Sequence, residues 1–154
     1  MKTSTAGIIL IEGNESSKNR VYMDQVGLPT IGVGHLLTKD ELSSGKLHSI
    51  GVKWADGLTE QQTTDLLDHD LTPVEEAITS LVRVTLNQRQ FDSLASFVFN
   101  IGTTAFENST LLRVLNGGAY TQVPAQMRRW VYSMGITLPA LVRRREREIE
   151  MWNG

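Results

Sequence analysis

Three side chains of complementary chemistry lie close together near the start of the sequence: Glu15, Asp24 and Thr30. Eight residues separate Glu15 from Asp24, and five separate Asp24 from Thr30. If a helix ends at the first residue and a tight hairpin carries the other two, a carboxylic acid faces a carboxylate and a hydroxyl. Cleavage of a glycosidic bond uses such groups, because the departing oxygen takes up a proton while the far side of the sugar ring is attacked. The set therefore indicates hydrolysis of a sugar chain.

Each of these residues also has an ordinary structural explanation when it is taken alone. A glutamate near a helix end is usually a solvated charge, an aspartate before a turn usually forms that turn, and threonine suits a strand. The combined spacing, followed at once by Gly32-x-Gly34-His35, is what favours catalysis.

The surrounding pattern predicts elements that can position these three side chains. Residues 6–14 read as a short helix, so Glu15 stands at its C-terminal end. Residues 20–24 and 30–33 are β-type segments, and the glycine and proline within 25–29 mark a turn between them. This hairpin would bring Asp24 close to Thr30.

Most of the remaining sequence predicts helices. Capping-box patterns begin at Thr38 and Thr59, and each predicts the start of a helix. The helix after Thr38 closes at Ser44-Gly45, and residues 45–57 read as a loop. Pro73 lies inside the second helical pattern, which predicts a kink or a restart at Thr72 because proline lacks the N–H that helices use. From Leu86 onward the segment is apolar almost all round and reads as a central helix; further helices are expected over 110–116, 124–133 and 139–152.

Composition restricts the possible classes of protein. The 154 residues contain no cysteine, and the three histidines show no metal-ligand spacing, so we expect no disulfide, no metal and no cofactor. No apolar run approaches the roughly 20 residues of a membrane span, and the N-terminal residues do not resemble a signal peptide. Residues 83–154 carry nine basic and five acidic side chains, which suits an anionic polymer, but no helix-turn-helix signature supports nucleic-acid binding.

These residues together resemble the active-site signature of the phage-type lysozymes, glycoside hydrolase family 24. The resemblance rests on Glu15, Asp24 and the segment Thr30-Ile31-Gly32-Val33-Gly34-His35. Further landmarks follow in the family's order along nearly the whole chain: Leu81-Val82-Arg83-Val84, Asn87-Gln88, Phe99-Asn100-Ile101-Gly102 and Arg143-Arg144-Arg145-Glu146-Arg147.

The resemblance needs a choice between two glutamates. Family members usually have Glu-Gly at the catalytic position, and here Glu-Gly occurs at Glu12-Gly13. Only Glu15 keeps the family's spacing to Asp24 without a gap, so Glu15 is assigned and Glu12 is read as a surface residue. Ser16 then stands where glycine is usual, which raises a question about the backbone after the acid, since glycine adopts positive φ freely and serine does not.

The resemblance implies an α+β fold, mostly α, of the lysozyme-like two-lobe type. Residues 1–58 would form an N-terminal lobe with the catalytic hairpin, 59–82 a connecting helix kinked near Pro73, and 83–154 a helical C-terminal lobe, together one lysozyme domain.

The resemblance also implies roles for individual residues. Glu15 would be the general acid, and Asp24 with Thr30 would hold a water for inversion at the anomeric carbon. Carboxyl groups about 6.5 to 9.5 Å apart fit that route, whereas about 5 Å fits direct attack by Asp24. Leu36, Phe99 and Ser109 would contact substrate. His35 paired with Asp70, and Arg144 as a partner of Glu15, would give structural support; whether burial or that arginine dominates the pKa of Glu15 stays open.

The expected function is that of an endolysin. It would hydrolyse the β-1,4 bond between N-acetylmuramic acid and N-acetylglucosamine in peptidoglycan glycan strands and so lyse the host cell. A lytic transglycosylase is an alternative, although it has no need of Asp24 and Thr30. A catalytically silent peptidoglycan-binding module is another.

The expected cellular setting follows from the same resemblance. The protein would be a monomer without stable membrane insertion or nucleic-acid binding. It would stay in the host cytoplasm until a holin releases it to the periplasm and cell wall.

Overall fold

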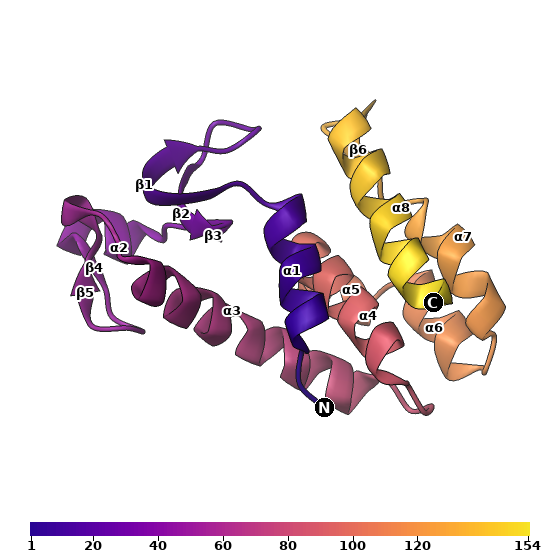
Figure 1. The fold of residues 1–154 in the computed structure, drawn as a ribbon. Coiled ribbons are helices and arrows are strands. Elements are labelled where there is room, and N and C mark those ends of the chain that lie inside the picture. The colour runs from indigo at the N-terminus through magenta and orange to yellow at the C-terminus, as the bar shows by residue number, and fades with distance from the viewer. The chain divides into compact units, whose positions relative to one another are not determined.

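Short strands and helices occupy the first part of the chain, and helices dominate the rest (Figure 1). The structure, a computed structural model, describes residues 1–154. It contains two compact units, one formed by Glu12–Thr72 and the other by Met1–Ile11 together with Pro73–Gly154. The boundaries fall inside two helices, α1 (Thr5–Asn14) and α3 (Glu60–Leu81).

The unit of residues 12–72 is built around a three-stranded antiparallel sheet in the order β1-β2-β3. The strands are β1 (Ser17–Met23), β2 (Pro29–Val33) and β3 (His35–Leu36). Tyr22 pairs with Thr30, but the register shifts between Lys18 and Tyr22, which marks a bulge in β1. The predicted hairpin is therefore confirmed, with β1 starting three residues earlier than expected.

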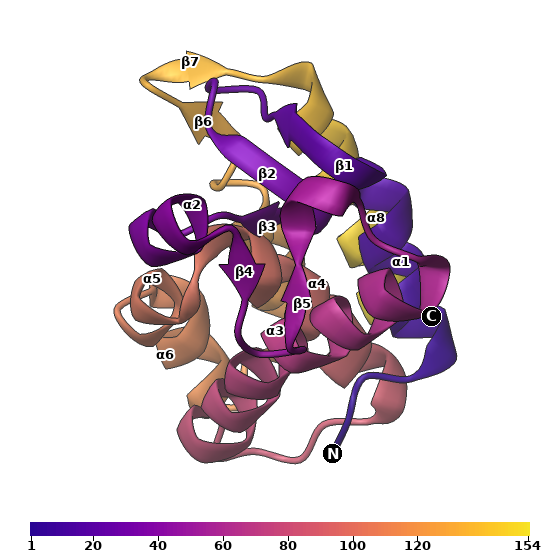
Figure 2. The ribbon, with the colours of Figure 1, turned by 90° about the vertical axis from the view of Figure 1, so that its left-hand side faces the viewer.

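A second part of this unit follows β3. Helix α2 (Lys39–Ser44) has the predicted capping box between Thr38 and Glu41 and ends at Gly45 in the left-handed conformation. The expected loop over 45–57 is wrong, because β4 (Lys46–Leu47) pairs with β5 (Val52–Lys53) before a 3₁₀ turn, η1 (Trp54–Asp56) (Figure 2). A small core closes the unit, formed by Ile31, Leu37, Leu47, Leu58 and Leu66.

A kink or a restart is predicted at Thr72, and the restart is wrong, because α3 runs without a break through Pro73. The kink stays a prediction. The helix does begin after the predicted box at Thr59, whose hydroxyl accepts the Gln62 amide. An interior proline costs about 3 kcal/mol, but burying one large apolar side chain gains about 1.5 to 3 kcal/mol. Leu71, Val74 and Ile78 are all buried around the proline, which offsets its cost.

The other unit packs helices around a larger core. Its helices are α4 (Gln88–Ile101), α5 (Thr103–Glu107), α6 (Thr110–Asn116), α7 (Val123–Met127) and α8 (Pro139–Asn153), with a 3₁₀ turn η2 (Tyr120–Gln122). The central helix and the helices over 110–116 and 139–152 are thus confirmed. Phe91, Leu94, Phe97 and Leu111 are fully buried among them.

The helix predicted over 124–133 is longer than the one in the structure. It ends at Met127, and β6 (Tyr132–Ser133) then pairs with β7 (Ile136–Thr137). Met134 and Gly135 have φ of 52° and 77° between these strands. Positive φ at both central residues is the geometry of a tight hairpin turn. The glycine was a visible signal, but a methionine at positive φ is uncommon and could not be foreseen.

Candidate active site

Glu15 follows the last residue of α1, as predicted, and its carboxyl group lies against Gly34. A Cβ added to Gly34 would lie 2.9 Å from Oε2 and 3.0 Å from Cδ of Glu15. Gly34 has φ of 64°, between β2 and β3. The glycine after β2 therefore serves two purposes: it makes the turn, and it leaves room for the acid.

Asp24 is fixed by the turn that joins β1 to β2. Its Oδ1 accepts hydrogen bonds from the amides of Val26, at 2.9 Å, and Leu28, at 2.8 Å. The backbone amide of Asp24 donates to the Leu28 carbonyl at 2.9 Å. Because Oδ1 is used in this way, Oδ2 is the oxygen left to meet a ligand.

Thr30 is buried on β2, one strand position from the turn. Its hydroxyl donates to the Leu28 carbonyl at 3.0 Å, the same carbonyl that accepts the Asp24 amide. With its proton committed to Leu28, the Thr30 oxygen is an acceptor toward any other partner.

Tyr22 connects the two parts of the site and was not among the predicted site residues. Its hydroxyl donates to the Ser16 carbonyl at 2.9 Å. Burial first, and then the charges of Glu15 and Asp24, raise the pKa of Tyr22, while a hydrogen bond from the Gly34 backbone opposes the rise. The phenol thus lies in the field of both carboxylates.

The question raised by Ser16 is answered by its backbone. Among residues other than glycine, only Met134 has a positive φ. Residue 16 therefore does not need glycine's conformational freedom, and its carbonyl takes part in the Tyr22 contact.

The predicted pairing of His35 with Asp70 is present, at 2.7 Å from Nδ1. A second carboxylate, Glu41, lies 3.0 Å from Nε2, and the same Glu41 caps α2. Burial disfavours the imidazolium, but the hydrogen bonds and charges of Asp70 and Glu41 outweigh it and raise the pKa of His35 from 6.5 to about 9. Burial also opposes the Glu41 carboxylate, yet the Thr38 amide and His35 together lower the pKa of Glu41.

The side chains predicted to contact substrate occupy different settings. Leu36 is 50% exposed on β3, opposite Thr30 in the register. Phe99 lies on α4 and packs partly against the larger core. The Ser109 hydroxyl caps α6 by accepting the Leu112 amide, and it donates to the Phe106 carbonyl. Their contacts with substrate stay predictions.

Arg144 lies buried on α8 in the unit that contains residues 73–154. It forms an ion pair with Glu148 at 3.2 Å and donates to the Ser96 carbonyl. Its predicted partnership with Glu15 stays a prediction.

Two of the overlooked groups had signals that a sequence can carry. Tyr22 kept the family spacing to Glu15, and Glu41 was recognised as a cap but not as a partner of His35.

No group of three or more His, Asp or Glu side chains is arranged to hold a metal ion. None of the helices is both long enough and apolar enough to cross a membrane.

Comparison with known proteins places this geometry in a family. The sequence profile described as phage lysozyme matches residues 12–148. The endolysin of Salmonella phage P22 is 40% identical over 152 residues, 97% of each chain. The crystal structure of a P22 lysozyme mutant, 37% identical, matches 100% of this chain and 99% of its own with a TM-score of 0.81.

A third match is the structure of a muramidase domain. The muramidase domain of SpmX from Asticaccaulis excentricus is 34% identical, covers 99% of this chain and 98% of that one, and also has a TM-score of 0.81. These neighbours confirm the mostly helical α+β lysozyme fold. Because the profile spans most of the sequence and a relative is 40% identical along nearly all of it, the chain belongs to the phage lysozyme family and is a lysozyme-type enzyme.

Proposed function

We propose that this enzyme is an endolysin that hydrolyses the β-1,4 bond between N-acetylmuramic acid and N-acetylglucosamine in peptidoglycan, with inversion at the anomeric carbon. Glu15 donates its proton to the glycosidic oxygen as the bond from C1 to that oxygen breaks. A water attacks C1 from the opposite face and gives its proton to Asp24.

The observation that carries this proposal is the way in which Asp24 and Thr30 are hydrogen-bonded to the turn at Leu28. Asp24 Oδ1 and the Thr30 proton are both committed to the turn. Asp24 Oδ2 and the Thr30 oxygen are then two acceptors for the two hydrogens of one water. A water held in this way keeps a lone pair for attack, which suits an inverting reaction.

The setting of Glu15 supports the role of acid. Its carboxyl rests on Gly34, and Tyr22 lies within the field of both Glu15 and Asp24. One small group of residues therefore joins the donor to the carboxylate that would accept the proton of water.

The decisive comparison is Glu15→Gln against Glu12→Gln. Both changes are isosteric and remove one charge, and Glu12 is the other glutamate in the family-like Glu-Gly pattern. General acids contribute about 10²- to 10⁴-fold, so Glu15→Gln should lower kcat on purified peptidoglycan by that factor. Glu12→Gln should retain more than half of kcat. Equal rates for the two variants would remove Glu15 from the mechanism.

Product analysis tests the bond and the stereochemistry. Mass spectrometry should find reducing N-acetylmuramic acid ends, and proton NMR during the first turnovers should find the α-anomer. Anhydro ends would identify a lytic transglycosylase instead, and an initial β-anomer would indicate a double displacement through Asp24.

Asp24→Asn separates the charge of the aspartate from its role in the turn. The asparagine oxygen can still accept the Val26 and Leu28 amides, so the hairpin should persist. The variant should keep its thermal stability and lose activity by about 10²-fold or more.

We further propose that the enzyme acts as a monomer, is held in the host cytoplasm and reaches the wall after a holin opens the membrane. Support comes from relatives named endolysin, including that of phage P22. Expression in Escherichia coli with and without a co-expressed holin tests this route: lysis should follow only when both are present.

A further inference from the structure

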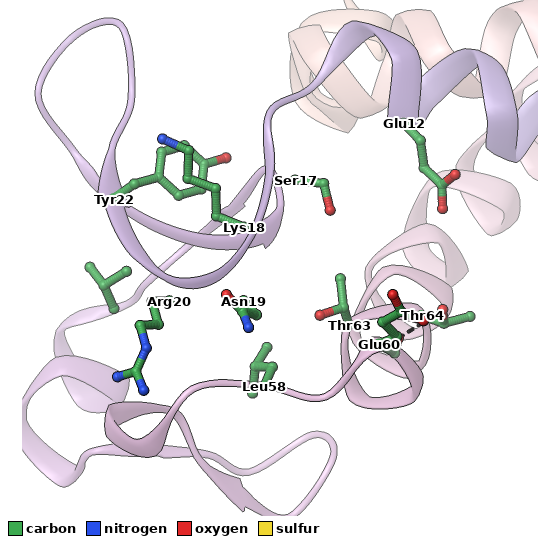
Figure 3. A pocket seen from close by; sticks show the side chains of 11 residues that line it. Glu12, Ser17, Lys18, Asn19, Arg20, Tyr22, Leu58, Glu60, Thr63 and Thr64 are labelled. Carbon is green, nitrogen blue, oxygen red and sulfur yellow. Dashed lines mark hydrogen bonds between the residues drawn. The ribbon is translucent and has the colours of Figure 1, made fainter.

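A polar pocket lies beside β1, and of its lining residues only Tyr22 belongs to the candidate active site. It has a volume of about 800 Å³ and is formed within the unit of residues 12–72. Its walls come from β1, from the end of α1 and from the start of α3 (Figure 3). Pockets of about 300 to 1,000 Å³ are of the size that holds small ligands.

The charged side chains of the pocket are sorted by sign. Lys18 and Arg20 come from β1, whereas Glu12 comes from α1 and Glu60 from α3. Figure 3 shows the two basic residues toward one side and the two acidic residues toward the other. None of the four forms an ion pair within the chain. The pocket therefore presents separated positive and negative ends.

Uncharged polar groups occupy the space between these ends. Ser17, Asn19 and Thr63 line the pocket there, with hydroxyl and amide groups that can both donate and accept hydrogen bonds. Leu58 supplies an apolar floor and is 4% exposed. A ligand that fits is polar along its length and carries opposite charges at its two ends.

The walls of the pocket are held in place by the backbone. The Leu58 amide donates to the Asn19 carbonyl at 2.7 Å, which joins β1 to the segment before α3. The Thr59 and Gln62 side chains cap the start of α3 reciprocally. Lys18 lies over the Tyr22 ring, with its ammonium 5.1 Å from the ring centre, which restrains one basic group. A pocket with fixed walls loses little conformational entropy on binding.

From these features we propose that the pocket binds the peptide stem of peptidoglycan. The inference rests on the proposed function for the identity of the polymer. Where a stem is attached, the lactyl carboxyl of N-acetylmuramic acid is tied up in an amide and the glycan is uncharged, whereas the peptide stem carries free carboxylates and, in many bacteria, a free ammonium group. Carboxylates would lie toward Lys18 and Arg20, and the ammonium toward Glu12 and Glu60. The pocket shares Tyr22 with the active site, so a stem could be held while its glycan is cleaved.

The test uses a sugar-free stem tetrapeptide, N-acetyl-L-alanyl-γ-D-glutamyl-meso-diaminopimelyl-D-alanine, as the probe, because its acetyl group replaces the lactyl amide of peptidoglycan and leaves only the diaminopimelyl ammonium free. Titration followed by amide NMR should shift residues 17–22 and 58–64. Arg20→Gln and Glu60→Gln should each weaken binding by about 3- to 10-fold, the range expected for one charged contact. Lys53→Gln and Glu76→Gln remove equally exposed charges outside the pocket and should leave binding unchanged.

A second probe checks that charge is what the pocket recognises. The same peptide with its diaminopimelyl amino group acetylated as well should bind at least about 3-fold more weakly to the wild type and should no longer distinguish Glu60→Gln. Equal binding of the two peptides, or amide shifts confined to other residues, would overturn the proposal.

An activity measurement separates this inference from the proposed function. Arg20→Gln should raise KM on peptide-bearing peptidoglycan by about 3- to 10-fold, with kcat unchanged, and should leave KM unchanged on glycan stripped of its peptides. Equal effects on both polymers would overturn peptide recognition while leaving glycan hydrolysis intact. Failure to cleave either polymer would overturn the proposed function, and the NMR titration would still decide the pocket.

Discussion

At the scale of single residues, the tightest constraint on the proposed acid is the missing side chain of Gly34. Gly34→Ala would place a methyl group 2.9 to 3.3 Å from the Glu15 carboxyl atoms, so Glu15 must move. Displacing a reacting group by about 1 Å can lower the rate by about 10²-fold. We expect kcat on peptidoglycan to fall by about 10- to 100-fold.

Gly51→Ala is the matched control for this substitution. Gly51 has nearly the same φ, 67° against 64°, but nothing lies within 4 Å of its added Cβ. Both variants should lose about 1 kcal/mol of stability from the strained backbone, measured by thermal unfolding. Only Gly34→Ala should lose specific activity, and a similar loss in Gly51→Ala would show that general destabilisation is the cause.

A second residue-scale prediction concerns Tyr22. Tyr22→Phe removes the hydroxyl that donates to the Ser16 carbonyl next to Glu15. One hydrogen bond is worth about 1 kcal/mol, so kcat/KM should fall by about 5- to 10-fold through looser positioning of the acid. Steady-state kinetics with Tyr132→Phe as control checks this, since Tyr132 is exposed on β6. If Tyr22→Phe retains full activity, the phenol does not position Glu15.

Residue spacing made Glu15, Asp24 and Thr30 the candidate catalytic residues, but it could not show how they are held. The Tyr22 contact with Ser16 spans the register shift in β1, and a bulge changes the register without leaving a clear sequence signal. Glu41 looked like a helix cap because a cap is local, whereas its contact with His35 requires β3 and α2 to be packed.

At the scale of elements, His35 joins β3, α2 and α3 through Glu41 and Asp70. Its pKa of about 9 in the folded chain exceeds the unfolded value of 6.5, so folding favours the protonated form. The resulting stabilisation is fully present below about pH 6.5 and disappears as pH rises toward about 9. We expect a loss of about 1 to 3 kcal/mol over this interval, an amount reduced by solvent screening.

Denaturant unfolding of wild type and His35→Gln between pH 5.5 and 9.5 measures this contribution. The difference between the two proteins should shrink as pH rises. The lowered pKa of Glu41 adds stability that is present above about pH 4.5 and is lost in more acidic solution. His48→Gln is the control, because His48 meets only exposed Asp40. An unchanged wild-type-to-His35→Gln difference across the range would show that the pair is not charged.

Elements were predictable wherever their signals are local. Both capping boxes and the glycine that ends α2 lie within one turn of the helices that they delimit. The pairing of β4 with β5 was missed because two-residue strands have no periodicity to detect. The helix restart predicted next to Pro73 was wrong because local propensity opposes a helix there, and tertiary burial of its neighbours overrides it.

At the scale of the whole molecule, one of the two compact units is formed by segments that are far apart in the sequence. The first residues belong with 73–154, because the Thr3 amide donates to Glu75 at 2.6 Å and the Ser4 amide donates to Asp92 at 2.9 Å. These bonds connect residues 72 and 88 positions apart, which no local pattern reveals. Each unit nevertheless has its own core, one including Leu66 and the other Leu94.

Separate cores predict separate responses to cavity-forming substitutions. Leu66→Ala and Leu94→Ala each delete the side chain of a fully buried leucine, at a cost of about 2 to 5 kcal/mol. Hydrogen exchange should speed up mainly within 12–72 for Leu66→Ala and mainly within 73–154 for Leu94→Ala, because local opening follows the core that is weakened. Since α3 contributes to both units, a uniform acceleration along the chain in either variant would instead show that the two cores open as one cooperative unit.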